Sequence, residues 1–209
     1  MPGEPFGPPG IVYISGGAIL MTMKILFEKK TYKLLGAQIA GYDGVDKRID
    51  VLACAMRGGL TALQLSDLDL AYAPPFSSAK DPVNMAGFMI ENIAEGRMKQ
   101  FHLADLADLS KDKSVTLLDV RTQEEYDEDH ADGFVHIPVD ELRDRMSELD
   151  PEKPVYVMCQ SGLRSYIASR ILMQNGFDCF SFSGGYRLYQ TVFEDKAAYK
   201  TASLCGKEV

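Results

Sequence analysis

The chain has 209 residues, of which 46% are hydrophobic and 25% are charged, and its formal net charge is −8. These values are ordinary for folded proteins and argue against disorder across the whole chain. The length is enough for two domains, each with its own core. The negative charge argues against a nucleic-acid partner, because phosphate backbones bind clustered Lys and Arg.

Neither a membrane span nor a secretory signal is visible. The longest apolar run, residues 16–23, is far shorter than the roughly 20 residues that cross a bilayer, and the N-terminus lacks a charged region followed by an apolar one. Four cysteines without paired spacing fit reduced thiols better than disulfides, and three isolated histidines give no zinc pattern. We therefore expect a cytoplasmic protein with no metal site.

The first half of the chain predicts an α+β domain with an antiparallel sheet. Residues 1–10 hold four prolines and three glycines, which exclude a helix, so we expect a disordered lead-in. Residues 20–28 alternate apolar and polar side chains with the period of a strand, and a polar turn leads to a second strand at residues 34–40. The two strands are expected to form a hairpin in a domain that spans residues 11–95.

Two helices complete this predicted domain. Residues 45–57 form the first, because apolar residues recur at helical spacing and Gly58 follows as a stop signal. Asp81 and Pro82 are an N-cap and a first helical residue, and they begin the second helix, which ends near Gly96. The expected apolar stripes are Val45, Ile49, Leu52, Ala53 and Met56 in the first helix, and Met85, Phe88, Met89 and Ile93 in the second.

The second half alternates strands with helices, which is typical of an α/β domain with a parallel, doubly wound sheet. Strands are predicted at residues 115–120, 155–158 and 178–182. Helices are predicted at residues 122–127, 139–149 and 165–175. Thr122 and Glu125 have the spacing of a capping box, and Gly176 ends the longest helix.

Cys159 is the residue with the clearest chemical context. It follows the apolar strand at residues 155–158, at the carboxyl edge where open α/β sheets bind ligands, and a tight loop leads from it to a helix. Such a loop can turn backbone N–H groups toward an anion, and Arg164 is a neighbouring cation; both favour a thiolate. A cysteine after an apolar strand is otherwise a small buried hydrophobic residue, but Gly162 and Arg164 favour a nucleophile here.

The same segment resembles the rhodanese family of sulfurtransferases over residues 101–195. The motifs that carry the resemblance are Leu117-Leu118-Asp119-Val120-Arg121, Glu125-Tyr126, His130 with Gly133, Ile137-Pro138, Cys159-Gln-Ser-Gly-Leu-Arg164 and Ser183-Gly184-Gly185. The resemblance implies that the Cys159 thiolate takes sulfane sulfur from thiosulfate or polysulfide, holds it as a persulfide, and passes it to a thiol or cyanide. Phe134 and Tyr189 depart from the family's usual alanine and tryptophan, which changes the shape of the pocket and leaves the nucleophile loop intact.

The resemblance also implies roles for the residues around the nucleophile. Arg164 is expected to act in catalysis with Cys159, and the expected substrate-binding residues are Gln160, Ser161, Gly162, Leu163, Ser165, Asp119 and Arg121. For Asp119 and Arg121 a structural ion pair is the preferred interpretation, with direct substrate contact as the alternative. His130 and His136 are expected to be structural.

Two other functions stay open at this point. Related folds in phosphatases and arsenate reductases pair a cysteine with an arginine, but those families resemble Cys-x5-Arg, whereas four residues separate Cys159 from Arg164. The smaller loop suits a sulfur atom better than a tetrahedral oxyanion. A non-catalytic dimerising or docking module is the second alternative, although inactive rhodanese members typically lose the loop cysteine.

The first half resembles the dimerisation domain of pyridine nucleotide-disulfide oxidoreductases, in the coenzyme A-disulfide reductase and NADH oxidase group. The similar segments are residues 44–52 and 70–87. This resemblance implies a homodimer in which Tyr13 and Tyr72 reach the partner subunit's disulfide site, or serve as ordinary interface or core tyrosines. No Gly-x-Gly-x-x-Gly motif is present, so FAD, NAD(P)H and coenzyme A are expected only in a longer parent enzyme and not in this chain.

The three remaining cysteines have separate interpretations. Cys54 is expected to pack against a second layer or a partner, because it lies opposite the predicted apolar stripe of its helix. Cys179 is expected in the core. Cys205 lies in a predicted tail at residues 196–209 and is the candidate for a second redox thiol. Met85 and Met89 are expected to pack in the core or at an interface.

Overall fold

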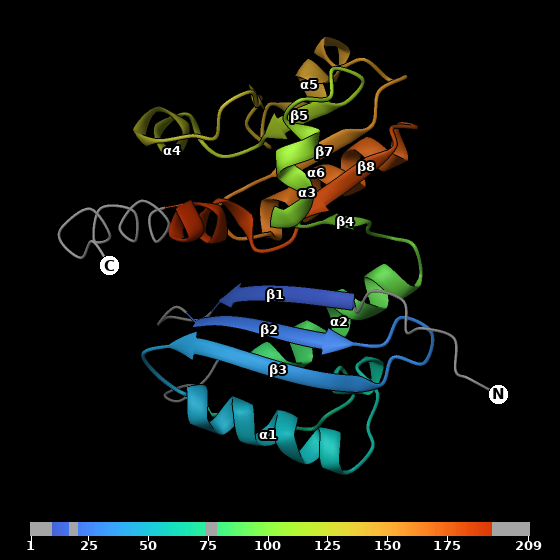
Figure 1. Ribbon diagram of the computed structural model, residues 1–209, viewed down its shortest axis with the longest axis vertical. Helices are drawn as coiled ribbons and strands as arrows, with labels where there is room; N and C mark the ends of the chain where they lie inside the picture. Colours follow the sequence, from blue (N-terminus) through green and yellow to red (C-terminus); the bar gives the residue numbers. More distant parts are fainter. Residues whose placement is uncertain (1–9, 17–20, 74–78, 194–209) are drawn as a thin grey trace, which may run out of the picture. The chain divides into compact units, whose positions relative to one another are not determined.

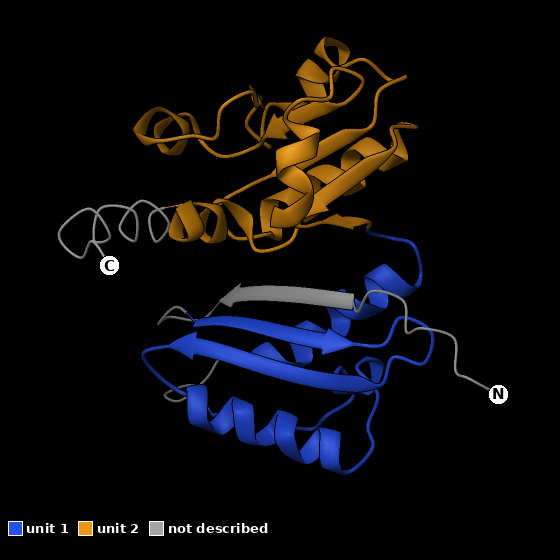
Figure 2. Cartoon of the chain, in the orientation of Figure 1, with its two compact units in different colours: residues 1–98 blue, residues 99–209 orange. Residues whose placement is uncertain are grey.

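The computed structural model describes residues 10–16, 21–73 and 79–193, and of residues 10–16 it describes the backbone. The chain divides into two compact units, Met1–Met98 and Lys99–Val209, which Figure 2 shows in blue and orange. Each unit has its own sheet and its own hydrophobic core. Residues 1–9 of the predicted lead-in and the tail at residues 196–209 lie outside the described residues.

The first unit is built on a three-stranded antiparallel sheet with strand order β1-β2-β3 (Figure 1). β2 (Met21–Phe27) and β3 (Leu34–Gly41) form the predicted hairpin, and alternate side chains of β2 are buried, as its apolar period requires. β1 (Gly10–Gly16) pairs with β2 and was not predicted. Gly10 therefore belongs to β1 and not to the predicted lead-in. Pro9, the last proline of that segment, directly precedes the strand.

Two helices and a short 3-10 turn cover one face of this sheet: α1 (Val45–Arg57), η1 (Leu63–Leu65) and α2 (Pro82–Ala94). The predicted stripe of α1 is shifted, because the helix buries Arg48 together with Leu52 and Ala55, while Met56 is exposed. The cause is an ion pair. The Arg48 guanidinium lies 3.0 Å from the carboxylate of Asp81, the residue that caps α2.

In α2 the buried face is also rotated away from the predicted stripe. A Cβ atom on Gly87 would lie 2.2 Å from the backbone N of Ser66, so the chain after η1 crosses directly over this glycine. Asn84 is buried beside it and donates from Nδ2 to the carbonyl oxygens of Leu65 at 3.0 Å and Leu68 at 2.8 Å. Met85, which the stripe placed in the core or at an interface, is 39% exposed in the chain.

The second unit holds the predicted parallel sheet, with five strands in the order β4-β8-β7-β5-β6. The predicted strands are β5 (Thr116–Asp119), β7 (Val155–Met158) and β8 (Cys179–Phe182). The edge strands β4 (Gln100–Phe101) and β6 (Val135–His136) were missed, since two residues are too few to show a strand period.

The helices of this unit are α3 (Leu103–Leu109), α4 (Gln123–Glu128), α5 (Leu142–Arg145) and α6 (Leu163–Gln174), and residues 185–193 are also helical. The capping box of Thr122 and Glu125 is confirmed. The helix predicted over residues 139–149 is wrong: the segment forms only α5 and the 3-10 turn η2 (Met146–Glu148). The backbone N of Val139 donates to the carbonyl oxygen of Val120 at 3.2 Å, and the helix begins only three residues later, at Leu142.

Both faces of the parallel sheet are covered, which confirms the doubly wound arrangement (Figure 1). Successive strand residues point to opposite faces, so Leu118 and Val157 pack in one core with α5 and α6. Leu117 and Met158 pack in the other core with α3 and Tyr186. No helix in the described ranges is both long and apolar enough to span a membrane.

Candidate active site

Cys159 follows β7 directly and is 1% exposed. Its loop runs from Cys159 to Gly162, and α6 begins at the next residue. Gly162 has φ 118°, in the left-handed region that side-chain-bearing residues rarely adopt, so glycine allows the chain to turn from strand to helix within so few residues. The loop therefore places the sulfur atom at the N-terminus of a 12-residue helix.

The sulfur atom already accepts a backbone hydrogen bond. The N–H of Gly162 donates to Cys159 Sγ at 3.1 Å, and Ser165 Oγ lies 3.5 Å from the same sulfur atom. A donor N–H and the positive end of a helix dipole are both groups that interact favourably with a negative atom. The buried sulfur of Cys159 therefore lies where the loop offers a hydrogen-bond donor and a helix N-terminus.

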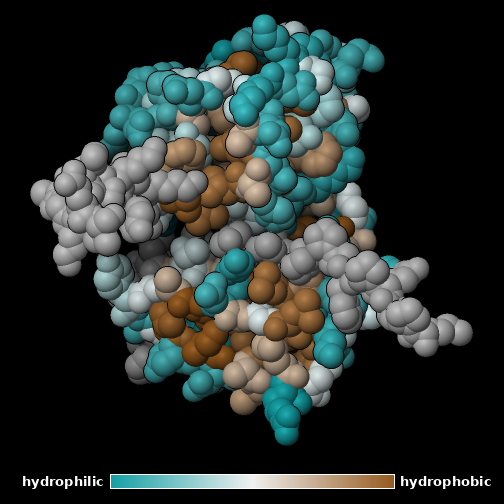
Figure 3. Space-filling model, viewed as in Figure 1, coloured by the Kyte–Doolittle hydropathy of each residue, from teal (hydrophilic) through white to brown (hydrophobic). Residues whose placement is uncertain are grey.

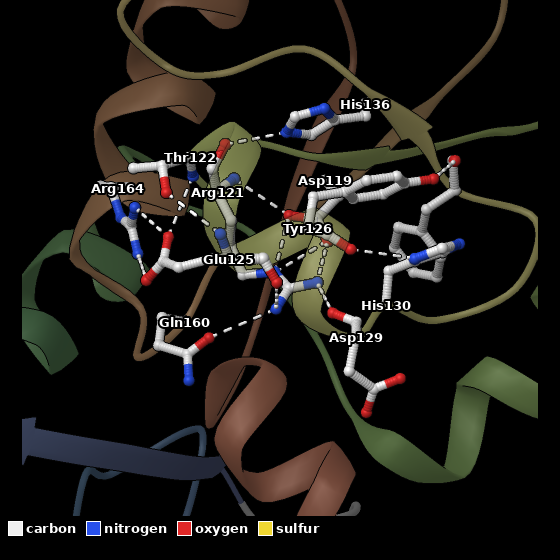
Figure 4. Close-up of polar contacts among 11 residues, drawn as sticks. Asp119, Arg121, Thr122, Glu125, Tyr126, Asp129, His130, His136, Gln160 and Arg164 are labelled. Carbon is white, nitrogen blue, oxygen red and sulfur yellow. Dashed lines mark hydrogen bonds and ion pairs between the residues drawn. The ribbon is translucent and has the colours of Figure 1, made fainter.

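Arg164 is bound to a carboxylate. Its guanidinium forms two hydrogen bonds with Glu125, at 2.6 Å and 2.7 Å, and this pair joins α4 to α6 (Figure 4). The Arg164 guanidinium lowers the pKa of Glu125 to about 2, and Glu125 in turn raises the pKa of Arg164. Arg164 thus stands beside the loop as one half of an ion pair, and not as the separate cation that the sequence suggested.

Asp119 and Arg121 form a second ion pair, and both residues are at least 98% buried. Arg121 Nε lies 2.9 Å from Asp119 Oδ2, and the Asp119 carboxylate also accepts the backbone N–H of Arg121 at 3.0 Å. The other guanidinium nitrogens donate to the carbonyl oxygens of Glu125 and Asp129 and to the side chain of Gln160 (Figure 4). Burial and complete pairing are what the structural interpretation of Asp119 and Arg121 requires.

The segment after β8 closes over the nucleophile loop, and sequence reasoning gave it no role. The backbone N of Tyr186 donates to the carbonyl oxygen of Cys159 at 2.8 Å. The centroid of the Tyr186 ring lies 3.8 Å from Cζ of Arg121, so the guanidinium stacks over the ring. Gly185 has φ 68°, and a Cβ atom there would lie 2.6 Å from the carbonyl oxygen of Gln160. In the sequence, the glycine pair Gly184-Gly185 of the rhodanese motif is the signal that could have predicted this close contact.

The two histidines pack around one tyrosine. The ring of Tyr126 is stacked between His130 and His136, with both centroid distances 4.1 Å (Figure 4). His136 Nε2 lies 2.9 Å from the carbonyl oxygen of Arg121, and His130 Nδ1 lies 3.0 Å from the carbonyl oxygen of Tyr126. These contacts support the segment before β6, in keeping with the structural interpretation of both histidines.

The other predicted site residues are spread over both units. Gln160, Ser161 and Gly162 are half-buried in the loop, Ser165 is fully buried, and Leu163 is 67% exposed. In the first unit Tyr72 is 53% exposed, and Tyr13 lies in β1, where the structure describes only the backbone.

The remaining cysteines differ in environment. Cys179 is fully buried, as predicted, and burial raises the pKa of its thiol to about 11. Cys54 is exposed, so it does not pack against a second layer formed by the described residues. Cys205 lies outside the described residues. Among the described residues no group of three or more His, Cys, Asp or Glu side chains is arranged to hold a metal ion.

Comparisons with known families give each unit its class. Residues 102–191 match the rhodanese-like domain, and residues 13–83 match the dimerisation domain of pyridine nucleotide-disulphide oxidoreductases. The chain therefore joins a pyridine nucleotide-disulphide oxidoreductase dimerisation domain to a rhodanese-like domain, which confirms both resemblances seen in the sequence.

Individual proteins are similar to most or to part of the chain. The crystal structure of reduced Bacillus anthracis CoADR-RHD is 40% identical and covers 90% of this chain with a TM-score of 0.86, and 35% of that chain is matched. The structure of an NAD-dependent persulfide reductase from A. fulgidus is 34% identical, with a TM-score of 0.73. The matched region is 85% of this chain and 33% of the reductase chain. The coenzyme A disulfide reductase of Staphylococcus epidermidis is 44% identical over 66 residues, which are 32% of this chain and 15% of that protein. The chain thus spans about a third or less of these relatives.

Two of the turns that connect a strand to a helix in this unit are occupied by its own side chains. The turn after β5 holds the buried Arg121, and in the turn after β7 the backbone N–H of Gly162 donates to the sulfur of Cys159.

Proposed function

We propose that the second unit is a sulfurtransferase that carries sulfane sulfur as a persulfide on Cys159. The observation that carries this proposal is the position of the sulfur atom, at the end of β7 and the N-terminus of α6, with the Gly162 N–H donating to it at 3.1 Å. The rhodanese-like match and the persulfide reductase relative support the same chemistry.

The proposed reaction has two displacement steps. The Cys159 thiolate attacks the outer sulfur of a donor such as thiosulfate or a polysulfide. The donor's sulfur–sulfur bond breaks, and its electron pair leaves with sulfite or the shortened polysulfide. An acceptor thiolate, or cyanide in an assay, then attacks the outer sulfur of the persulfide. The Cys159 thiolate leaves with the bonding pair, and the enzyme returns to its starting state.

The first unit is proposed to form a homodimer. Its exposed apolar side chains support this, because a domain that leaves several of them in water gains by burying them against a second copy. Figure 3 shows apolar side chains on the surface of this unit. Its exposed large hydrophobic residues lie on several elements: Leu35 in β3 at 48%, Met56 in α1 at 37%, Met85 in α2 at 39%, and, outside helices and strands, Tyr42 at 97% and Tyr72 at 53%. Tyr72, with Tyr13, is proposed to reach the partner subunit's disulfide site.

A longer parent enzyme is proposed to use the sulfur that Cys159 delivers. The relatives named above are a coenzyme A disulfide reductase and a persulfide reductase, so we place FAD, NAD(P)H and coenzyme A in domains outside this chain. A cytoplasmic location fits the free thiols of Cys54, Cys159 and Cys179.

The test of the sulfurtransferase proposal is a thiosulfate-to-cyanide transfer assay of the full chain. Cys159→Ser should abolish transfer, because serine cannot form a persulfide. Single changes of Cys54, Cys179 and Cys205 to serine should each retain most of it. An inactive wild-type chain would instead favour a docking module, and activity that survives Cys159→Ser would overturn the assignment.

A further inference from the structure

Three buried side chains, connected by hydrogen bonds, lead from β8 to Cys159. Ser181 Oγ donates to Ser165 Oγ at 2.9 Å, and Ser165 Oγ lies 3.5 Å from Cys159 Sγ. Ser165 is 0% exposed, Ser181 is 3% exposed and Cys159 is 1% exposed, so protein atoms surround the three groups. Ser181 belongs to no motif that the sequence suggested, and the two serines are 16 residues apart in the chain.

The number of hydrogens that each group can donate limits how these three side chains can pair. Each serine hydroxyl has one hydrogen to donate. Ser181 gives its hydrogen to Ser165, and Ser165 gives its own to the carbonyl oxygen of Gly162 at 2.9 Å. While Cys159 is a thiol, its S–H can point to Ser165 Oγ. A thiolate has no hydrogen and only accepts, so it needs a donor where the thiol needed an acceptor.

Ser165 can become that donor at little cost. The carbonyl oxygen of Gly162 also accepts the backbone N–H of Tyr166 at 3.0 Å, so it keeps a partner if Ser165 turns away. Ser165 Oγ meanwhile keeps the hydrogen bond that it accepts from Ser181. A rotation of one hydroxyl hydrogen, from Gly162 to the sulfur, therefore leaves each of these buried polar groups paired.

We propose that Ser165 donates its hydroxyl hydrogen to the Cys159 thiolate, and that Ser181 is a positioning residue that holds Ser165 ready to do so. Ser165 and the N–H of Gly162 then stabilise the negative sulfur from two directions, and the lost thiol proton goes to solvent. The proposal deepens the proposed function, because it concerns the same nucleophile.

The charged side chains around the loop form two ion pairs. Beside the loop, β5 contributes Asp119 and the turn after it contributes Arg121, and these two residues are paired at 2.9 Å. α4 and α6 contribute Glu125 and Arg164, which are paired at 2.6 Å. Each pair is neutral as a whole, and Arg164 still interacts electrostatically with Cys159, so Ser165 and the Gly162 N–H add hydrogen bonds at short range to the effect of these charges.

The experiment follows Cys159 alkylation by iodoacetamide across pH, with the labelled peptide quantified by mass spectrometry. Only the thiolate reacts, so the midpoint of the pH–rate profile reports its ionisation. We expect Ser165→Ala to move the midpoint upward by about one pH unit, which is about a ten-fold lower rate at pH values below the midpoint. Ser181→Ala should move it in the same direction by less.

The double variant separates positioning from a direct effect. If Ser181 acts through Ser165, then Ser165→Ala with Ser181→Ala should match Ser165→Ala alone. Ser169→Ala is the matched control, because Ser169 is a buried serine one turn along the same helix and packs toward Cys179; its profile should equal that of the wild type. Thermal unfolding of each variant checks that the chain is folded.

Two outcomes would overturn the proposal. One is an unchanged midpoint in a folded Ser165→Ala chain, and the other is a Ser181→Ala effect that persists in the Ser165→Ala background. The titration needs no sulfur donor. A chain that shows the expected midpoints but transfers no sulfur would therefore contradict the proposed function and leave this inference standing.

Discussion

Two ion pairs of different exposure support the Cys159 loop. All three guanidinium nitrogens of Arg121 are hydrogen-bonded, and the residue is 2% exposed. The pair of Glu125 and Arg164 is about a quarter to a third exposed. The first pair therefore has a large effect on stability if one partner is removed, whereas water and salt weaken the second.

Asp119→Asn should destabilise the second unit strongly. The change leaves the Arg121 charge buried without its carboxylate, and removal of one member of a buried pair costs about 3–5 kcal/mol. Urea unfolding of the chain measures this loss. Asp140→Asn, at an exposed aspartate, should change the free energy of unfolding by no more than about 0.5 kcal/mol. Equal effects of the two substitutions would show that Asp119 does not hold the loop in place.

Glu125→Gln should remove an acid-dependent part of the stability. The pKa of Glu125 is lowered from 4.5 to about 2 by Arg164, so its carboxylate stabilises the fold fully above pH 4.5 and loses this effect as the pH falls toward 2. Glutamine keeps the capping box of α4, so only the ion pair is lost, at about 1 kcal/mol or less near neutral pH.

The measurement for Glu125 is the unfolding midpoint of both chains between pH 7 and pH 2.5. The difference between wild type and Glu125→Gln should shrink as the pH falls. Glu124→Gln, one residue earlier in α4, serves as the control and should follow the wild-type curve. A difference that stays constant down to pH 2.5 would exclude the ion pair as its cause.

At the scale of elements, the sequence predicts those whose signal is local. β7 and α1 have the predicted bounds, and β2 and α6 differ from prediction by one or two residues at their ends, because periodicity and glycine mark these elements. Contacts made far along the chain were not predictable. Arg48 is buried in α1 only because Asp81 lies opposite, and Ser181 meets Ser165 only once β8 is placed beside β7.

Gly185→Ala tests how the segment after β8 closes the nucleophile loop. An added Cβ would lie 2.6 Å from the carbonyl oxygen of Gln160, so the loop must shift, and we expect most of the sulfur-transfer activity to be lost. Gly176→Ala is the control, since Gly176 also has positive φ but has no atom within 4 Å of the added Cβ. It should lose about 1–2 kcal/mol of stability from its backbone conformation and keep its activity. Equal activities in the two variants would show that the close contact is not needed.

At the scale of the whole molecule, each unit has its own core and a separate proposed role. The first unit exposes apolar side chains on both its sheet and its helices, and we propose that the second carries the nucleophile. We expect the full chain to be a dimer by light scattering at high micromolar concentration and to bind neither FAD nor NAD(P)H. A monomer at that concentration would contradict the dimerisation proposal, and flavin absorbance in the purified chain would contradict the placement of the cofactors in other domains.

The most direct test of the account is to locate the transferred sulfur. The full chain is incubated with one equivalent of thiosulfate or polysulfide, digested without reductant, and its cysteine peptides are measured by mass spectrometry. We predict one added sulfur atom on the peptide that contains Cys159, removable by cyanide. Added sulfur on the peptide of Cys54, Cys179 or Cys205 instead, or on none, would contradict the claim that Cys159 carries the persulfide.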